Sequence, residues 1–278
     1  MIKLVGGQKI SPPGKLFEGK NVDVVFPILH GPFGEDGTMQ GLLKLANIPF
    51  VGAGVLGSAI GMDKDVMKRL LRDAGISVAQ FLTLRRQDTP DYNDVTKELG
   101  LPLFVKPANM GSSVGVSKVN NEADFIDAVK EAFKYDNKIL IEENILGHEI
   151  ECSVLGNESP IVSVPGEVIP RHEFYSYEAK YVDENGAGLE IPAKLSDEET
   201  DKIKSIALKT FKVLECEGFG HVDCFLTKEG KVYVNEINTI PGFTSISMYP
   251  KLWEASGISY SELIDKLIQL AIDRFQKE

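Results

Sequence analysis

Three oxygen-bearing side chains near the C-terminus have the types and spacing of a metal site. Asp223 lies in one predicted strand, and Glu236 and Asn238 stand at the end of the next. Residues 227–230 between them have the pattern of a four-residue hairpin loop, so folding there brings the three side chains together. Carboxylate and amide oxygens suit Mg²⁺, which completes its shell with water and phosphate oxygens. The hairpin therefore predicts a magnesium site.

The opposite interpretation is that Glu236 and Asn238 are the polar face of an edge strand. Strand side chains alternate with a period of two, so Val232 and Val234 are expected to share a face with them. Valines on that face indicate burial, and a buried carboxylate without a cation is costly. The pattern therefore favours the metal site.

A lysine and a glycine-serine loop form a second chemical signal. Lys106 ends a predicted strand, and residues 109–115 then offer backbone N–H groups together with the hydroxyls of Ser112 and Ser113. Such loops hold phosphate oxygens, and the lysine supplies a positive charge. The order differs from a Walker loop, because the lysine precedes the glycines. A hairpin turn beside a surface lysine explains this stretch equally well when it is taken alone.

Two further segments have the composition of a nucleotide site. The run 139–145 ends a strand in Glu142 and Glu143. With apolar Ile145 they offer the wall and the hydrogen-bonding groups that an adenine needs. A strand end with solvated acids is an equally good interpretation of that run alone. The aromatic loop 172–181 suggests a lid over phosphates, with a plain surface loop as the alternative.

Residues 52–57 match the dinucleotide fingerprint G-x-G-x-x-G. That fingerprint requires a strand before it, a long helix beginning on it, and a second strand that ends in an acid. Here the helical pattern begins later, near Met62, and no second strand is predicted after it. We interpret 52–57 as a linker between lobes.

The composition argues against several classes of function. Thirty Lys and Arg against 41 Asp and Glu leave a net charge of −11, which disfavours a nucleic-acid or anionic-membrane surface. No apolar run approaches the roughly 20 residues of a membrane helix, and the N-terminus lacks a secretion-signal pattern. Cys152, Cys216 and Cys224 have no metal-ligand spacing and are expected to be reduced thiols. We expect a cytoplasmic protein.

Hydrophobic periodicity and capping residues predict the elements that hold these groups. Helices are expected over 41–46, from Met62 to Gly75, and after caps at Asn121, Ser196 and Ser259. The predicted strands are 22–29, 48–51, 103–106, 114–119, 139–142, 150–155, 222–226 and 231–237. The length of 278 residues favours at least two lobes over a single core.

Several stretches together match the motifs of one family. They are His30-Gly31, Gly34-Glu35-Asp36-Gly37-Thr38-Met39-Gln40-Gly41, Met62-Asp63-Lys64, Val105-Lys106-Pro107, Gly111-Ser112-Ser113-Val114-Gly115, Tyr177-Glu178-Ala179-Lys180-Tyr181, and 235–245 (Asn-Glu-Ile-Asn-Thr-Ile-Pro-Gly-Phe-Thr-Ser). In this order, from about Val22 to the C-terminus, the chain resembles the D-alanine–D-alanine ligase family of the ATP-grasp superfamily. The number and order of the motifs make the resemblance specific.

The resemblance implies an α/β fold of the α+β ATP-grasp type, with two α+β lobes sandwiching ATP and an incomplete N-terminal α/β lobe. The expected domains are the partial N-terminal lobe 1–61, the central ATP-grasp lobe 62–147, and the C-terminal lobe 148–278 with the lid loop and metal site. The family normally begins with a strand and a Gly-Gly-x-Ser-x-Glu loop that grips the first D-alanine. Residues 1–20 contain no such loop, so we expect the first part of that lobe to be missing.

The resemblance also implies the ligands of ATP and magnesium. Two magnesium ions, replaceable by Mn²⁺, would be held by Asp223, Glu236 and Asn238, with Glu236 bridging them. The nucleotide ligands would be Lys64, Lys106 and Lys180 on the phosphates, Ser112 and Ser113 in the loop, Glu142 with the backbone of Glu143 and Ile145 on adenine, and Glu149 on the ribose.

The groups around the reacting atoms follow in the same way. They would be Tyr181, Ser112 and Glu149 as the latch of the lid, the Gly242 N–H for the oxyanion, and His30, Ser247 and Met248 for substrate. The family places an arginine two residues before the metal aspartate, where this chain has His221. Histidine reproduces the charge and the donor fork of arginine only partly.

The implied reaction is the ATP-dependent ligation of two D-alanines for peptidoglycan precursors. ATP would convert the first D-alanine to an acyl phosphate, which the amine of the second then attacks. A homodimer is also implied. The absent loop and His221 leave one alternative, a nucleotide-binding remnant without turnover. Another second substrate, such as D-lactate, is a further alternative, against which Tyr181 weighs.

Overall fold

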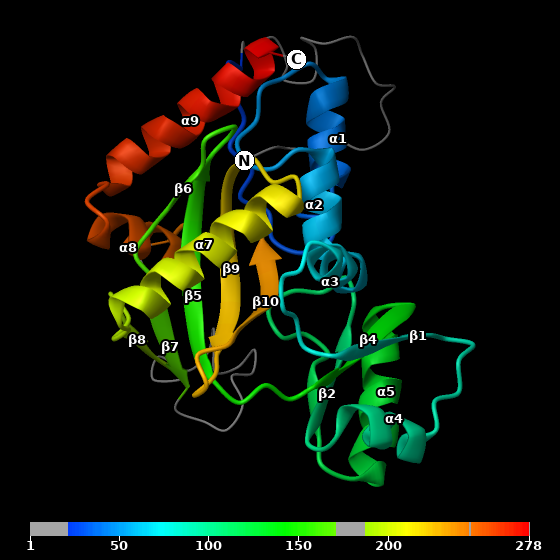
Figure 1. The fold of residues 1–278 in the computed structure, drawn as a ribbon. Helices are drawn as coiled ribbons and strands as arrows, with labels where there is room; N and C mark the ends of the chain where they lie inside the picture. The colour runs from blue at the N-terminus through cyan, green and yellow to red at the C-terminus, as the bar shows by residue number, and fades with distance from the viewer. Residues whose placement is uncertain (1–21, 171–186, 245, 278) are drawn as a thin grey trace.

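Two antiparallel sheets form the framework of the chain (Figure 1). The computed structural model describes residues 22–170, 187–244 and 246–277. The smaller sheet has the order β1 (Phe81–Arg85), β4 (Lys138–Glu143), β2 (Leu103–Pro107), β3 (Ser117–Val119). The larger has the order β10 (Val232–Asn238), β9 (Gly218–Leu226), β5 (His148–Gly156), β7 (Gly166–Pro170), β8 (Ala187–Glu190), with β6 (Ile161–Val162) on β5. The helices are α1 (Thr38–Leu45), α2 (Val55–Met62), α3 (Lys64–Asp73), α4 (Tyr92–Leu99), α5 (Glu122–Tyr135), α7 (Asp197–Val213), α8 (Met248–Ala255) and α9 (Tyr260–Lys277).

Helices α4 and α5 cover one face of the smaller sheet. Leu103 and Val105 of β2 are buried in the core beneath these helices. Because side chains alternate along a strand, Phe104 and Lys106 of β2 point the other way, where both line a cavity. The same strand thus supplies the core on one side and the site on the other.

Helix α7 packs across one face of the larger sheet (Figure 1). Val222 and Cys224 of β9 are buried beneath it. The intervening residues of β9 face the opposite side, which α8 and α9 cover around Phe219. Farther along that face, Asp223 and Phe225 line the cavity instead.

Helix α3 joins the two sheets. Its Met67 and Leu71 are fully buried in the core beneath α7. Its polar side bonds to the smaller sheet, because Asp65 accepts a hydrogen bond from Thr83 Oγ1 of β1 at 2.9 Å. The Asp65 carboxylate also lies 3.3 Å from Lys138 Nζ of β4. One helix therefore packs on both halves of the chain.

The segment before α2 is more irregular than its sequence predicts. The expected strands 22–29 and 48–51 are wrong, since they are reduced to one parallel bridge between Val25 and Phe50. No further strand lies beside them among the described residues, so a regular ladder cannot form. Aromatic and apolar side chains of this segment pack onto the larger sheet instead.

The prediction that 52–57 is a linker is wrong in its second half. Helix α2 begins at Val55, with Gly54 as its N-cap. Glycine lets this helix lie directly on neighbouring backbone, since a Cβ on Gly57 would stand 2.5 Å from the Glu215 carbonyl oxygen. The glycines of this stretch therefore serve close packing.

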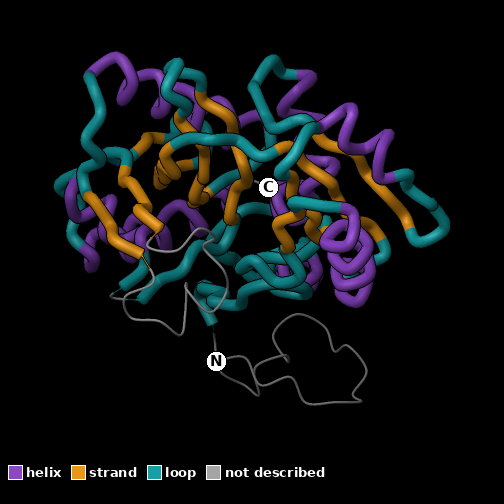
Figure 2. Tube along the Cα trace, turned by 90° about the horizontal axis from the view of Figure 1, so that it is seen from below, coloured by secondary structure: helices purple, strands orange, loops and turns teal. Residues whose placement is uncertain are grey.

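Most of the other predicted elements are confirmed. The Asn121 side chain caps α5, and Ser196 forms a full capping box with Glu199 at the start of α7. Strand β3 is shorter than the predicted 114–119, because turns occupy the first half of that stretch. In the view of Figure 2, strands run through the middle with helices outside them. Among the helices of the described ranges, none combines the length and apolar character needed to cross a bilayer.

Candidate active site

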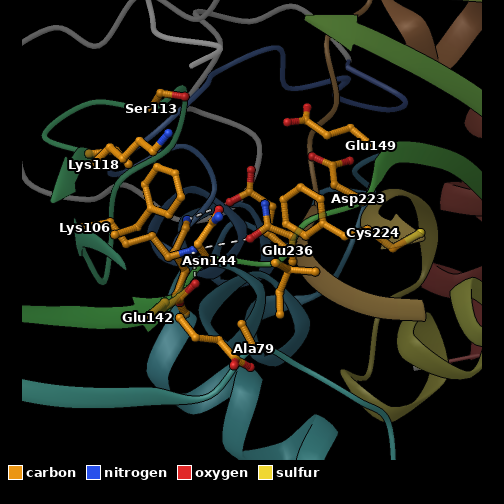
Figure 3. A pocket seen from close by; sticks show the side chains of 18 of the residues that line it. Ala79, Lys106, Ser113, Lys118, Glu142, Asn144, Glu149, Asp223, Cys224 and Glu236 are labelled. Carbon is orange, nitrogen blue, oxygen red and sulfur yellow. Dashed lines mark hydrogen bonds and ion pairs between the residues drawn. The ribbon is translucent and has the colours of Figure 1, made fainter. Parts of the chain in front are cut away.

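The open faces of the two sheets enclose a cavity of about 350 Å³, a size typical of small-molecule sites. Lys106 and Glu142 reach it from the smaller sheet (Figure 3). Glu149, Asp223 and Glu236 reach it from the larger sheet. The cavity therefore brings cations and carboxylates from distant parts of the sequence into one place.

A β-bulge in β10 turns the predicted metal residues toward this cavity. The pairing with β9 shifts between Val234 and Glu236, which puts Glu236 opposite Asp223. An extra residue of this kind breaks the period of two. The prediction that both valines of the strand share a face with Glu236 and Asn238 is therefore wrong. The valines are buried beneath α7, and the polar residues lie on the other face.

The oxygen donors of the hairpin lie within reach of one another. Asn238 Nδ2 donates to Asp223 Oδ2 at 3.3 Å. The ammonium of Lys64 lies 2.9 Å from a Glu236 oxygen, with both side chains largely buried. Carboxylate and amide oxygens without a thiol among them fit a hard cation such as magnesium.

Glu142 is a buried carboxylate held by two lysines. Lys106 Nζ lies 2.8 Å from one of its oxygens and Lys68 Nζ 3.2 Å from the other. Burial alone would raise the pKa of Glu142, but the two ammonium groups outweigh it and lower the pKa. Lys106 also donates to Asn235 Oδ1 at 3.3 Å, which joins the smaller sheet to the larger.

Lys68 is absent from the residues predicted from the sequence. Its side chain is fully buried, and this burial lowers its pKa to about 8 although Glu142 lies beside it. Its spacing could have identified it from the sequence, since Lys68 follows Lys64 by four residues on α3 and so shares a face with it.

The strand end predicted for adenine forms part of the cavity wall. Glu143 and Ile145 both line it, together with the rings of Phe104 and Phe225. The Glu143 N–H donates to the Gln80 carbonyl at 3.0 Å. A backbone contact of Glu143 with a ligand would therefore use its carbonyl oxygen.

The glycine-serine loop has an unusual backbone. Ser112 and Ser113 have φ angles of 54° and 59°, a left-handed conformation that is rare for residues other than glycine and is frequent at ligand sites. Ser113 lines the cavity, and Ser112 does not belong to the lining. Lys64 Nζ donates to the Met110 carbonyl at 2.8 Å, which attaches the loop to α3.

His221 lies buried beside the oxygen donors of the hairpin. Its Nε2 is 2.6 Å from Glu151 and 3.5 Å from Asp223. Burial opposes charge on the ring, but these two carboxylates outweigh it and raise the pKa of His221. Glu151 is absent from the predicted residues. It follows Glu149 by two positions on β5, and side chains two apart on a strand share a face. This spacing could have identified Glu151 from the sequence.

Ser247 and Met248, predicted for substrate, stand at the N-terminus of α8. The Ser247 hydroxyl accepts the Thr244 N–H at 3.0 Å. A Cβ on Gly242 would come within 2.8 Å of that hydroxyl, so glycine permits the close approach. Backbone N–H groups at a helix N-terminus favour a carboxylate. This group lies outside the lining of the cavity.

The remaining predicted residues are not brought into the cavity lining. His30 precedes a loop in which Glu35 accepts the Gly31 N–H at 2.6 Å. Burial raises the pKa of Glu35. Lys180 and Tyr181 lie outside the described residues. The structure adds Lys118 to the lining, a lysine that no sequence motif marked.

Two family profiles match the chain. The profile of the D-ala D-ala ligase C-terminus matches residues 70–269, and that of the D-ala D-ala ligase N-terminus matches 5–53. A D-alanine–D-alanine ligase of Oceanobacillus iheyensis is 60% identical over 259 residues, which cover 92% of this chain and 71% of that relative.

Solved structures give the same result. The D-alanine–D-alanine ligase of Coxiella burnetii has a TM-score of 0.84 at 46% identity, covering 93% of this chain and 70% of that one. The VanG D-Ala:D-Ser ligase of Enterococcus faecalis has a TM-score of 0.82 at 41% identity, covering 91% of this chain and 74% of that one. The ATP-grasp arrangement expected from the motifs is confirmed.

Proposed function

The chain belongs to the D-alanine–D-alanine ligase family, and we propose that its cavity joins two D-alanines through an acyl phosphate. Its function class is ATP-dependent ligation for cell-wall precursor synthesis. The observation that carries the proposal is the bulged hairpin. It puts Asp223 and Glu236 in the same cavity as Lys106. The carboxylates proposed to bind metal therefore lie beside the ammonium proposed to bind phosphate.

The nucleotide would bind between the two sheets. Lys64 and Lys106 would exchange their present carboxylate partners for phosphate oxygens, since both ammonium groups already reach the cavity. Ser113 would add its loop N–H groups. Adenine would lie between the apolar rings of Phe104 and Phe225. Glu142, Glu143, Ile145 and Glu149 keep the adenine and ribose roles that the motifs predict.

We propose magnesium as the metal, held by Asp223, Glu236 and Asn238. When bound, it would offset negative charge on the phosphoryl group in transfer. The chain's own part is to fix these oxygens on one strand pair, where Asp223 and Asn238 already share a hydrogen bond. Mn²⁺ has similar ligand preferences and should substitute for it.

Activation of the first D-alanine solves a chemical problem, because a carboxylate is a poor acceptor for an amine. Phosphoryl transfer converts it to a mixed anhydride with a good leaving group, and the amine of the second D-alanine displaces phosphate. The Gly242 N–H would stabilise the tetrahedral oxyanion. The N-terminus of α8, at Ser247 and Met248, would hold the carboxylate of the second substrate.

The test is phosphate release from ATP that depends on D-alanine and is matched by dipeptide. ATP binding without dipeptide would support the alternative of a nucleotide-binding remnant. His221→Arg separates the two further, because it restores the permanent charge and donor fork that the family has at this position. We expect this change to raise kcat.

The second substrate is a finer question than the reaction class. A D-Ala:D-Ser ligase is among the similar structures, so the shared fold alone leaves the acceptor open. We propose D-alanine, on the motif that contains Tyr181. Competing D-alanine with D-serine and D-lactate at neutral pH decides this, since preferred capture of either competitor contradicts the proposal.

We propose the domain boundaries that the motifs imply, with domains at 1–61, 62–147 and 148–278. We also propose a homodimer. Exposed apolar side chains on the N-terminal segment support an interface there, for example Phe33 and Leu45 with 74% and 79% of their surface exposed. Light scattering after size exclusion measures the mass of the assembly directly.

Because the proposed reaction consumes ATP, we propose that the protein works in the cytoplasm.

A further inference from the structure

The histidine that stands in the arginine position brings a nitrogen ligand to a site otherwise made of oxygens. Ligand atoms of Glu151, His221 and Asp223 all lie within 4.8 Å of one another. They belong to two adjacent strands, since Glu151 of β5 pairs directly with Asp223 of β9. His221 is buried, and the two carboxylates are about one-fifth exposed. The buried imidazole of His221 is therefore held in place, whereas the two carboxylates have room to rotate.

The other ring nitrogen is held in the manner of a metal-binding histidine. Nδ1 lies 3.3 Å from the Ser153 hydroxyl, which in turn lies 3.3 Å from the Tyr249 carbonyl. If Ser153 donates to that carbonyl, its oxygen accepts the Nδ1 proton and the Nε2 lone pair points at the two carboxylates. Ligating histidines usually donate their second N–H in this way. Without a metal, a proton on this lone pair fills the 2.6 Å gap to the Glu151 oxygen, and a divalent ion would take its place.

The three groups can reach a shared ion if their carboxylates move. Ligands about 2.1 Å from a tetrahedral ion lie roughly 3.4 Å from one another. The Nε2 to Glu151 distance of 2.6 Å must therefore open by about 0.8 Å, and the largest separation, within 4.8 Å, must close by no more than about 1.4 Å. Rotation of the two partly exposed carboxylates can supply shifts of this size.

We propose that Glu151, His221 and Asp223 bind a divalent transition metal, such as Zn²⁺ or Co²⁺, in the absence of nucleotide. Imidazole nitrogen favours these ions over magnesium, and three protein ligands leave an open position toward the cavity. The site rests on the proposed function only in sharing Asp223 with the magnesium site. Because they share it, the transition metal and magnesium compete for that carboxylate.

The experiment uses the full chain and Co²⁺ alone, titrated with magnesium and ATP absent. Visible d–d bands of Co²⁺ with a nitrogen ligand, saturating at one equivalent and abolished by Zn²⁺, are expected. His221→Asn should weaken Co²⁺ binding by at least about 100-fold, and Ser153→Ala by about 10-fold or more. His221→Arg and Glu151→Gln provide second variants if His221→Asn fails to fold.

His148→Asn is the matched control. His148 also lies 2.6 Å from a glutamate, Glu167, but its side chain is 59% exposed, and it belongs to no group of three ligands found among the described residues. Its loss should leave Co²⁺ binding unchanged. Absence of Co²⁺ binding, or binding that survives His221→Asn, overturns the proposal. Dipeptide formation with magnesium is measured separately, so failure of the ligase function is distinguishable.

Discussion

The ammonium of Lys64 on α3 lies 2.9 Å from the carboxylate of Glu236 on β10, so a predicted phosphate ligand neutralises a predicted metal ligand. Both groups are largely buried, and such a pair is little screened by solvent. Metal binding at Glu236 must displace this ammonium, and phosphate binding offers it a new partner. Nucleotide and metal should therefore bind cooperatively.

Lys64→Met tests this coupling. Without the ammonium, Mn²⁺ alone should bind more tightly, by about tenfold or roughly 1.4 kcal/mol, while ATP binds more weakly. Electron paramagnetic resonance of free Mn²⁺ measures the first effect. Lys130→Met is the control, because Lys130 is 70% exposed and pairs only loosely, at 3.7 Å, with Asp127. Equal Mn²⁺ affinity in both variants would contradict the coupling.

Lys68 should give stability a distinct pH dependence. Its pKa is about 8 when folded against about 10.4 for a free lysine. Below pH 8 both states hold the proton, and between the two values the unfolded chain holds it more. Stability therefore rises with pH across this window, by about 3 kcal/mol in full. Urea unfolding at pH 7.5 and pH 10 should show this gain relative to Lys68→Met; a constant difference between the two proteins contradicts it.

Two glycine substitutions should act in opposite directions. Gly57→Ala puts a Cβ 2.5 Å from the Glu215 carbonyl oxygen, so α2 must shift, which costs about 1–3 kcal/mol. Gly41→Ala lies within α1, where nothing stands within 4 Å of the added Cβ. Alanine there should stabilise the chain by up to about 1 kcal/mol. Denaturant unfolding compares the two, and destabilisation of similar size in both would count against this account.

Asp223→Asn should separate binding from stability. The change keeps the shape of the side chain but removes its negative charge from the group formed by Glu151, His221 and Asp223. Binding of ATP with Mn²⁺ should weaken at least about tenfold, or 1.4 kcal/mol. The free energy of unfolding should change by less than about 1 kcal/mol, because relief of the repulsion with Glu151 offsets the lost attraction to His221, which lies 3.5 Å away. Isothermal titration and thermal unfolding give the two readouts; a large loss of stability would refute this separation.

The sequence predicted the core faces and the caps well, because they depend on local periodicity and short-range hydrogen bonds. Alternation in β2 separates Lys106 from the core, and Asn121 caps its helix as expected. The hairpin of Asp223 and Glu236 also formed as predicted. What failed was the face assignment, because one bulge between Val234 and Glu236 reverses the alternation.

Other parts of the fold and of the site depend on contacts between residues far apart in the sequence, which residue spacing does not predict. Lys68 pairs with Glu142 across two elements that are far apart in sequence, and only the fold brings them together. The lost strand at 22–29 shows the converse, because an apolar run becomes a strand only beside a partner. The roles of the individual site residues stay predictions until binding is measured.

Helix α3 has a mechanical consequence. Its apolar side is buried in one core through Met67 and Leu71, and Asp65 is bonded to strands of the other sheet. Neither half can unfold without exposing a face of this helix or breaking its bonds. The two halves should therefore melt in a single cooperative transition, in which the calorimetric enthalpy equals the van't Hoff enthalpy.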